Sequence, residues 1–207
     1  MTTRRVVVTG IGALTPLGKS APDFWNGLIS GKSGVRTIEH FDTTDFPTKF
    51  AATIPEYDVS DYFDRKEGRK LDNVAQYALV ASEEAIKDSK VDLDAIDKDR
   101  VAVIVGTGVG GMKTFYDQSI EFHKRGARGV SPFFIPMLIP DIVPGQISIR
   151  YGFRGPNYSV VSACATGSNN IGAAYDAIRY GQSDMAITGG SEAPVTQIGI
   201  SGFNAMK

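Results

Sequence analysis

One corner of the chain, where an apolar segment meets a helical one, constrains the fold more than any other stretch. Residues 158–163 are rich in β-branched and aromatic residues and follow the turn-forming run 155–157, which predicts a short buried strand. From about residue 167 to residue 180, apolar side chains recur at helical intervals and a glycine follows, which predicts a helix. The only cysteine, Cys164, is therefore expected where a strand turns into a helix.

The position of Cys164 favours a nucleophile. At the start of a helix the backbone N–H groups lack intrahelical partners, and together with the helix dipole they stabilise a thiolate over a thiol. The same groups can hold the oxyanion that forms when a thiolate attacks a thioester, and Gly167 permits a tight turn. The alternative is an inert buried cysteine, because free cysteine is among the most buried residue types. The strand-to-helix setting favours the nucleophile.

The segment around Cys164 also resembles that of a known family. Residues 155–172 are similar to the nucleophile segment of the β-ketoacyl-[acyl-carrier-protein] synthases, which belong to the thiolase superfamily. Further similar motifs lie along nearly all of the 207 residues, and they resemble the chain-elongating type I/II branch rather than the CoA-primed initiating branch. These motifs are residues 6–18, 106–111, 131–136 and 186–193.

The resemblance implies a decarboxylative Claisen condensation in fatty acid elongation. Cys164 would accept an acyl group from acyl-carrier-protein thioester, malonyl-carrier protein would lose CO2, and the carbanion would attack the acyl-enzyme to give 3-oxoacyl-carrier protein. In the family two catalytic histidines and a lysine lie in motifs of the C-terminal half, and none of these motifs occurs in this sequence. The chain alone is therefore expected to be acylated but not to condense. The resemblance implies no metal and no organic cofactor.

The same resemblance assigns four residues to substrate binding and implies a homodimer. Val109 and Phe203 correspond to positions near the acyl chain and the active site. Phe134 and Met137 fall in a segment that lies at the family's dimer interface and helps to close the partner's acyl tunnel. In the family, the strand that corresponds to residues 158–163 pairs with its copy across a two-fold axis.

A basic run precedes the strongest helical pattern, which covers residues 71–87. Cations at a helix start oppose its dipole, at a cost of about a few tenths of a kcal/mol each. A solvated surface run is the ordinary interpretation of such a charge cluster. The resemblance instead implies that this segment docks the acidic acyl carrier protein. By this resemblance, the residues that dock the carrier protein are Lys66, Arg69 and Lys70, and also Arg65.

The glycine-rich run 106–111 admits a second interpretation. It follows an apolar strand pattern and matches the dinucleotide fingerprint, which also needs a second parallel strand with an acidic residue about 20 positions on. Residues 126–136 cannot form that strand, because they contain glycine and two prolines. We therefore expect these glycines to allow close backbone packing beside the nucleophile.

The chain has two histidines, His40 and His123. A cysteine nucleophile usually needs a base or a cationic neighbour, so a dyad of Cys164 with His123 has to be considered. The charged sequence around His123 favours a solvated helix end and argues against this dyad.

Composition excludes several function classes. The net charge of −1 predicts neither nucleic acid nor membrane as a partner, and no apolar run reaches the length of a membrane span. One cysteine excludes an internal disulfide, which fits a reducing compartment, and we expect a cytoplasmic location.

The predicted fold is an α/β domain. Strands expected at 4–9, 101–105, 158–163 and 185–188 alternate with helical stretches, which indicates a mixed, mostly parallel sheet with helices on both faces. The proline-broken segment 131–137 is expected to form neither a regular helix nor a central strand. The resemblance sharpens the prediction to a thiolase-like, layered αβαβα architecture. Residues 1–207 would be its N-terminal half, cut before the last strand of that half, with the C-terminal half absent.

Two rival functions remain open. One is a CoA-dependent, thiolase-like acyltransferase, against which the basic run is a weak argument. The other is a non-catalytic subunit of the same fold, like a chain-length factor. Such subunits lack the nucleophile, so Cys164 argues against this second rival.

Overall fold

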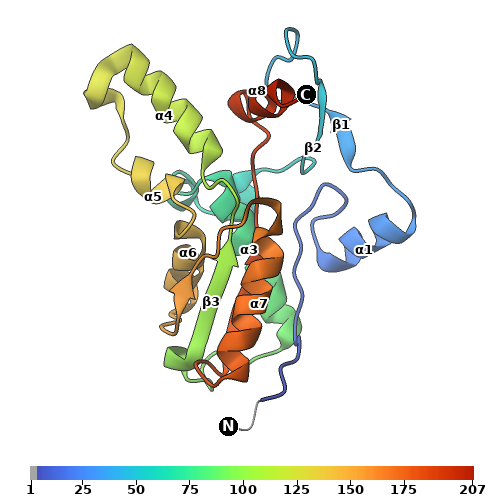
Figure 1. The fold of residues 1–207 in the computed structure, drawn as a ribbon, viewed down its shortest axis with the longest axis vertical. Coiled ribbons are helices and arrows are strands. Elements are labelled where there is room, and N and C mark those ends of the chain that lie inside the picture. The colour runs from blue at the N-terminus through green and yellow to red at the C-terminus, as the bar shows by residue number, and fades with distance from the viewer. Residues whose placement is uncertain (1–3) are drawn as a thin grey trace.

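A three-stranded parallel sheet forms the centre of the molecule in the computed structural model, which describes residues 4–207 (Figure 1). The central strand is β3 (Val101–Gly106), and all six of its residues are buried. β4 (Asn157–Tyr158) pairs with one edge of β3, and β5 (Met185–Gly190) pairs with the other along its whole length. The expected strands at 101–105 and 185–188 are therefore confirmed.

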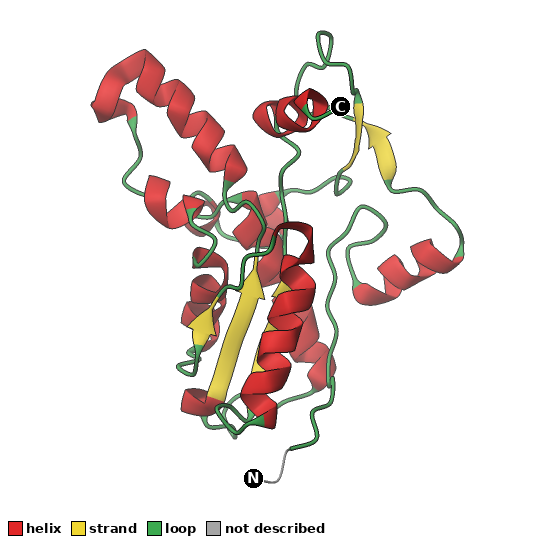
Figure 2. Cartoon of the chain, viewed as in Figure 1, coloured by secondary structure: helices red, strands yellow, loops and turns green. Residues whose placement is uncertain are grey.

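Helices cover both faces of this sheet, as predicted (Figure 2). Alternate side chains of β3 point to opposite faces. Val101, Val103 and Val105 pack against α3 (Asn73–Ser89) and α6 (Ile142–Tyr151), which carry half of the larger core cluster. Ala102 and Ile104 pack against Ala174 and Ala177 of α7 (Thr166–Arg179). α7, which follows the nucleophile corner, is therefore the helix that covers this second face of the sheet.

The remaining elements surround this layered core. The strands β1 and β2 form an antiparallel pair separate from the main sheet. The helix α4 extends away from the carboxyl ends of the strands, and α8 lies beyond the same end (Figure 1). The bounds of these elements are α1 (Ala21–Ile29), β1 (Val35–Thr37), β2 (Phe50–Ala52), α2 (Arg65–Gly68), α4 (Met112–Arg125), α5 (Phe134–Leu138) and α8 (Gln197–Ala205). Among the helices of residues 4–207, none is long and apolar enough to cross a membrane.

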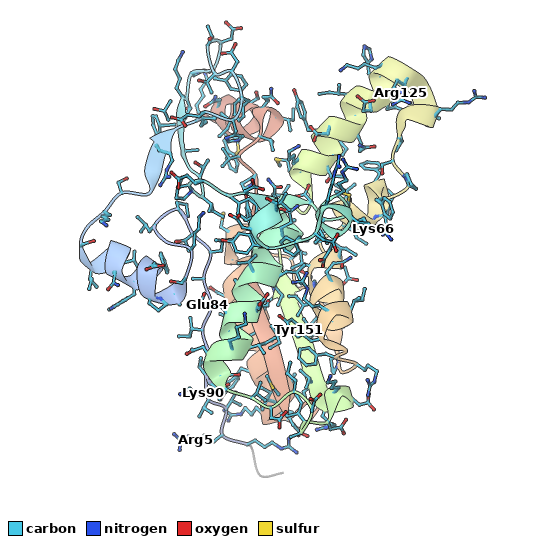
Figure 3. The ribbon with its side chains drawn as sticks, turned by 180° about the vertical axis from the view of Figure 1, so that it is seen from behind. Arg5, Lys66, Glu84, Lys90, Arg125 and Tyr151 are labelled. Carbon is cyan, nitrogen blue, oxygen red and sulfur yellow. The ribbon has the colours of Figure 1, made fainter. Side chains whose placement is uncertain are left out.

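The prediction of a first strand at residues 4–9 is wrong. The segment from residue 4 to residue 14 contains no strand, and Val8 is 80% exposed. Carboxylates of α3 replace strand partners: Ile11 N donates to Asp88 Oδ2 at 2.9 Å, and Ala13 N donates to Glu84 Oε2 at 2.8 Å. Figure 3 labels Glu84 on α3, close to the passing N-terminal segment. The segment is therefore held by a helix rather than by the sheet.

The strand predicted at 158–163 is also largely wrong, because β4 ends at Tyr158. Beyond it, polar side chains of α7 take the place of a neighbouring strand. Val160 N donates to Asn170 Oδ1 at 3.0 Å, and Asn170 Nδ2 donates to Val160 O at 2.8 Å. Ser162 N donates to Thr166 Oγ1 at 2.9 Å. The backbone leaves the sheet because its hydrogen bonds are satisfied by these side chains.

The prediction for residues 131–137 is wrong in part, because α5 is a short helix. Pro136 is its third residue. The first four N–H groups of a helix have no intrahelical acceptor, so the missing N–H of a proline costs nothing there. The proline therefore shapes the first turn of α5 instead of breaking it.

Candidate active site

Cys164 lies in a single 3₁₀ turn, Ala163–Ala165, directly before α7. Cys164 is exposed, so it is not the buried residue that the alternative interpretation expected. Ala163 has φ of 51°, a left-handed conformation that non-glycine residues adopt rarely and at a cost of about 1–3 kcal/mol. The turn therefore presents the sulfur outward on a sharply bent backbone.

Hydrogen-bond donors remain available at this corner. No side chain caps the first turn of α7. Within residues 4–207, the hydrogen bonds of the structure do not use the Cys164 amide N–H, whereas Ala165 N donates to Ser162 O at 3.1 Å. A free amide beside the sulfur can stabilise the negative oxygen of a tetrahedral intermediate.

A buried asparagine, missed at the sequence level, holds the corner in place. Asn170 is fully buried, and besides its two bonds with Val160 it donates from Nδ2 to Thr166 O at 2.7 Å. It thereby joins the residues before Cys164 to the first turn of α7. Its position inside a predicted helix could have indicated a bond to the backbone, because asparagine is a poor helix former whose side chain competes for backbone groups.

Glycines bring α7 close to the strand ends, as the sequence predicted. A Cβ on Gly106 would lie 2.3 Å from Asn170 Nδ2 and 2.5 Å from Thr166 Cγ2. A Cβ on Gly190, at the end of β5, would lie 2.9 Å from Gly167 Cα. Neither position tolerates a side chain without displacement of the nucleophile turn.

The dinucleotide interpretation of residues 106–111 gains no support from this arrangement. A strand, a glycine loop and a helix do follow one another, but α4 contacts mainly α5 and the turn 126–129. In the dinucleotide fold that helix packs on the sheet and its N-terminus faces the pyrophosphate. Here α4 points away from the sheet (Figure 1).

A second residue missed at the sequence level, Glu192, connects two loops beside the corner. Its Oε1 accepts a hydrogen bond from Thr107 Oγ1 at 2.8 Å, and its Oε2 accepts one from Gly108 N at 2.7 Å. Only the fold reveals this contact, because the partners are 85 residues apart.

Three elements of the structure carry the residues expected to bind the acyl chain. Val109 is 45% exposed in the loop after β3, and Phe134 and Met137 are half-buried on α5. The loop and α5 adjoin, since Gly111 N donates to Leu138 O at 2.9 Å. Phe203, on α8, is 60% exposed. The structure thus brings Val109 close to α5, and it places Phe203 on a separate element.

The four cations expected to dock a carrier protein line one open pocket of about 440 Å3 together with Phe133. Lys70 Nζ lies 5.3 Å from the centroid of the Phe133 ring. The structure corrects one detail, because Arg65 and Lys66 belong to the separate helix α2, which Asp64 caps. The start of α3 is capped by Asp72 instead, so the expected dipole cost at that helix does not arise. Figure 3 labels Lys66 in this region.

Neither histidine is placed to serve Cys164. His123 is exposed in the last turn of α4, two residues before Arg125, which lies at the far tip of that helix in Figure 3. It is about 16 Å along the helix axis from Met112, given a rise of about 1.5 Å per residue. His40 Nε2 donates to Val195 O at 2.8 Å. Over residues 4–207, no hydrogen bond joins either ring to the cysteine, and no group of three or more potential ligands could hold a metal ion.

Comparison with known proteins places this geometry in context. Residues 3–207 match the family model described as the N-terminal domain of β-ketoacyl synthase. The 3-oxoacyl-[acyl-carrier-protein] synthase 2 of Staphylococcus aureus is 43% identical over 204 residues, which cover 99% of this chain and 49% of that protein. The protein of the same name from Vibrio cholerae is 41% identical over 207 residues, which cover all of this chain and 50% of that protein. The chain spans about half the length of the curated relatives it matches.

Solved structures agree with the predicted fold. The ishigamide ketosynthase/chain length factor gives a TM-score of 0.88 at 26% identity, over 99% of this chain and 51% of its own. A β-ketoacyl synthase from Burkholderia phymatum gives a TM-score of 0.84 at 26% identity, over 98% of this chain and 50% of its own. A type II polyketide ketosynthase, solved in complex with its acyl-carrier protein, gives a TM-score of 0.82 at 28% identity, over 97% of this chain and 54% of its own. The layered, thiolase-like α/β fold is therefore confirmed.

Proposed function

The chain belongs to the β-ketoacyl synthase family, and on that premise we propose that it carries the nucleophile of an enzyme that condenses acyl groups with malonyl-carrier protein. The observation that carries the proposal is the exposed Cys164 at the bent start of α7, beside a free amide N–H. An exposed thiol on a fixed turn next to hydrogen-bond donors is the arrangement that acyl transfer requires.

The proposed reaction begins with acyl transfer. The Cys164 thiolate attacks the thioester carbonyl, the Cys164 N–H holds the oxyanion, and the carrier thiol leaves. Malonyl-carrier protein then loses CO2, and the carbanion attacks the acyl-enzyme carbonyl. The cysteine thiolate leaves, and the product is a 3-oxoacyl thioester two carbons longer. By the family resemblance, the histidines that stabilise the developing enolate lie outside these 207 residues, so this chain alone should not condense.

The basic pocket is the proposed docking site for the carrier protein. Arg65, Lys66, Arg69 and Lys70 place four cations around the exposed ring of Phe133. An acidic partner would be steered to such a patch, and an apolar side chain could contact the ring. The solved ketosynthase complex with an acyl-carrier protein supports a partner of this class for the present chain.

A homodimer and the four substrate residues form the rest of the proposal. β4 lies at the edge of the sheet and pairs with β3 on one side only among the described residues, so it is available to pair with a second copy. Val109, Phe134, Met137 and Phe203 would line the acyl site, with Phe134 and Met137 serving the partner's tunnel. The expected cytoplasmic location also stays a prediction.

Intact-mass spectrometry with a condensation assay tests the proposal. The chain is incubated with acyl-carrier-protein thioester and then with malonyl-carrier protein, beside a Cys164→Ala control. We expect one acyl mass on Cys164, none on the control, and neither CO2 nor a 3-oxo product. Product formation by this chain alone would refute the claim that further residues are needed.

The same assay separates the two rival functions. Acylation by acyl-CoA but not by the acyl-carrier protein would favour a thiolase-like acyltransferase. No acylation from either donor would favour a non-catalytic partner subunit, which is the kind of protein that one solved relative contains beside its ketosynthase. The exposed cysteine argues against that second outcome.

A further inference from the structure

We propose that Glu192 is a positioning residue, which holds the loop Thr107–Gly110 against the Cys164 turn and thereby sets the rate of cysteine acylation. The inference rests on the proposed acyl transfer. It adds a residue of the loop after β5 that does not itself touch the reacting atoms. Both loops leave the carboxyl ends of neighbouring parallel strands (Figure 1), so the fold brings them together.

Two hydrogen bonds fix the loop to the carboxylate. Glu192 accepts from Thr107 Oγ1 and from Gly108 N, one bond on each oxygen. Thr107 is 1% exposed, and its Oγ1 in turn accepts from Gly110 N at 3.0 Å. Three residues of the loop, at positions 107, 108 and 110, therefore depend on one side chain, and hydrogen bonds to a charged acceptor are the stronger kind.

The loop also lies directly against the nucleophile turn. A Cβ on Gly108 would lie 2.9 Å from Glu192 Oε2 and 3.1 Å from Ala163 O. Gly108 is thus enclosed between the carboxylate and the strained residue that precedes Cys164. Val109, expected to contact the acyl chain, is the next residue of the loop. A shift of Gly108 would move both the turn and that side chain.

Both loop hydrogen bonds depend on the side chain at this position. Two donors, a hydroxyl and an amide, converge on two acceptor oxygens. An alanine removes both acceptors, whereas a glutamine could keep both bonds, because its oxygen can accept from Gly108 N and its NH2 group can donate to the Thr107 hydroxyl. The backbone beside it is independently held, because Ser191 N donates to Gly106 O at 3.0 Å and Ser191 Oγ donates to Val74 O at 2.8 Å. Glu192→Ala should therefore release the loop while leaving the strand end in place.

The test compares Glu192→Ala with Glu39→Ala in the full-length protein. Both side chains are exposed and line the same cavity, of about 1160 Å3, but Glu39 makes no hydrogen bond to the loop. Intact mass gives the rate of acylation from acyl-carrier-protein thioester, and iodoacetamide gives the reactivity of the thiol toward a small reagent. We expect about a tenfold slower acylation in Glu192→Ala, because misplacement by a fraction of an ångström is costly in acyl transfer. Alkylation should stay within about twofold of wild type, and Glu39→Ala should match wild type in both assays.

A double-mutant cycle tests whether the effect of Glu192 passes through Thr107. Thr107→Val removes the hydroxyl that Glu192 accepts from, so its effect on acylation should not add to that of Glu192→Ala. Thr107→Ser keeps the hydroxyl and should restore most of the rate. Equal acylation rates in wild type and Glu192→Ala, or additive effects in the cycle, would overturn the positioning role. A wild-type protein that is never acylated would instead refute the proposed function, a result that the variants do not affect.

Discussion

At the scale of single residues, the corner depends on polar side chains that replace strand partners. Asn170 serves both backbone groups of Val160, and Thr166 accepts from Ser162 N. A buried polar group without a partner costs about 1–3 kcal/mol, so the loss of one of these bonds destabilises the fold by more than its formation stabilises it. The nucleophile turn is therefore held from the helix side.

Replacement of Asn170 by alanine should destabilise the folded chain by about 2–4 kcal/mol, because it leaves both backbone groups of Val160 unpaired in a partly buried site. Urea unfolding, followed by circular dichroism, measures the change. The matched control is Asn169→Ala. Asn169 is exposed, and its side chain donates only to Ser162 Oγ, so it should lose less than about 1 kcal/mol. Equal losses in the two variants would contradict the proposed role of Asn170.

At the scale of elements, continuous or periodic apolar patterns were predicted correctly. The strand 101–105 and the helix near 71–87 appear with small changes in their ends. These elements satisfy their own backbone groups or pair along a buried face, so the local pattern determines them. The failures at 4–9 and 158–163 have related causes. Backbone groups of residues 160 and 162, and those of residues 11 and 13 just after the first segment, bond to side chains of helices, and the short-range pattern does not contain that information.

The candidate site likewise contains residues that the sequence indicated and residues that only the fold reveals. Cys164 could be found from its strand-to-helix setting, and the four cations from their clustering. Asn170 and Glu192 could not, because each acts on a backbone segment that only the folded chain brings near. Position in the sequence identifies the reactive group, whereas the tertiary contacts identify the residues that hold it.

Substitutions of two glycines, one in β3 and one in α7, test how closely α7 must approach β3. Gly106→Ala should destabilise the chain by more than about 2 kcal/mol, because its Cβ would lie within 2.5 Å of two side chains of α7. Gly172→Ala, inside α7 with open space around it, should stabilise the chain by about 0.5–1 kcal/mol. Thermal and urea unfolding of both variants would check this. A harmless Gly106→Ala would show that α7 can move outward without loss.

At the scale of the whole molecule, many large apolar side chains remain exposed. Ile149 is 75% exposed on α6, Trp25 is 61% exposed on α1, and Ile171 is 53% exposed on α7. Such surfaces commonly pack against further protein. The chain spans about half the length of its curated relatives, so the prediction that it forms one half of a larger unit fits this exposure and stays a prediction.

An ion-pair cluster joins three distant segments and makes stability depend on pH. Hydrogen bonds from Arg100 and then Arg4 hold the pKa of the Asp184 carboxyl well below its usual range. Because the folded pKa is depressed, the contribution to stability is present above the unfolded pKa of about 3.9 and is lost as the pH falls below it. Asp184→Asn should therefore lower Tm at pH 7, and the difference from wild type should shrink below about pH 4. Asp45→Asn, an exposed control outside this cluster, should change Tm at neither pH. A constant difference between Asp184→Asn and wild type across this range would contradict the linkage.

Carrier docking is a property of the assembled surface, because α2, the turn before α3 and Phe133 together form the basic pocket. Reversal of charge in Lys66→Glu and Lys70→Glu should weaken binding of an acidic carrier protein by about tenfold or more at low salt. The difference from wild type should fall as ionic strength rises, since exposed charges are screened over about 10 Å at 0.1 M salt. Lys32→Glu makes the same change of net charge on an exposed loop outside the pocket and should bind almost as wild type does. Titration by fluorescence anisotropy at two salt concentrations measures all three variants. If Lys32→Glu weakened binding as much as the pocket variants, net charge rather than the pocket would govern association, and the docking proposal would have to be withdrawn.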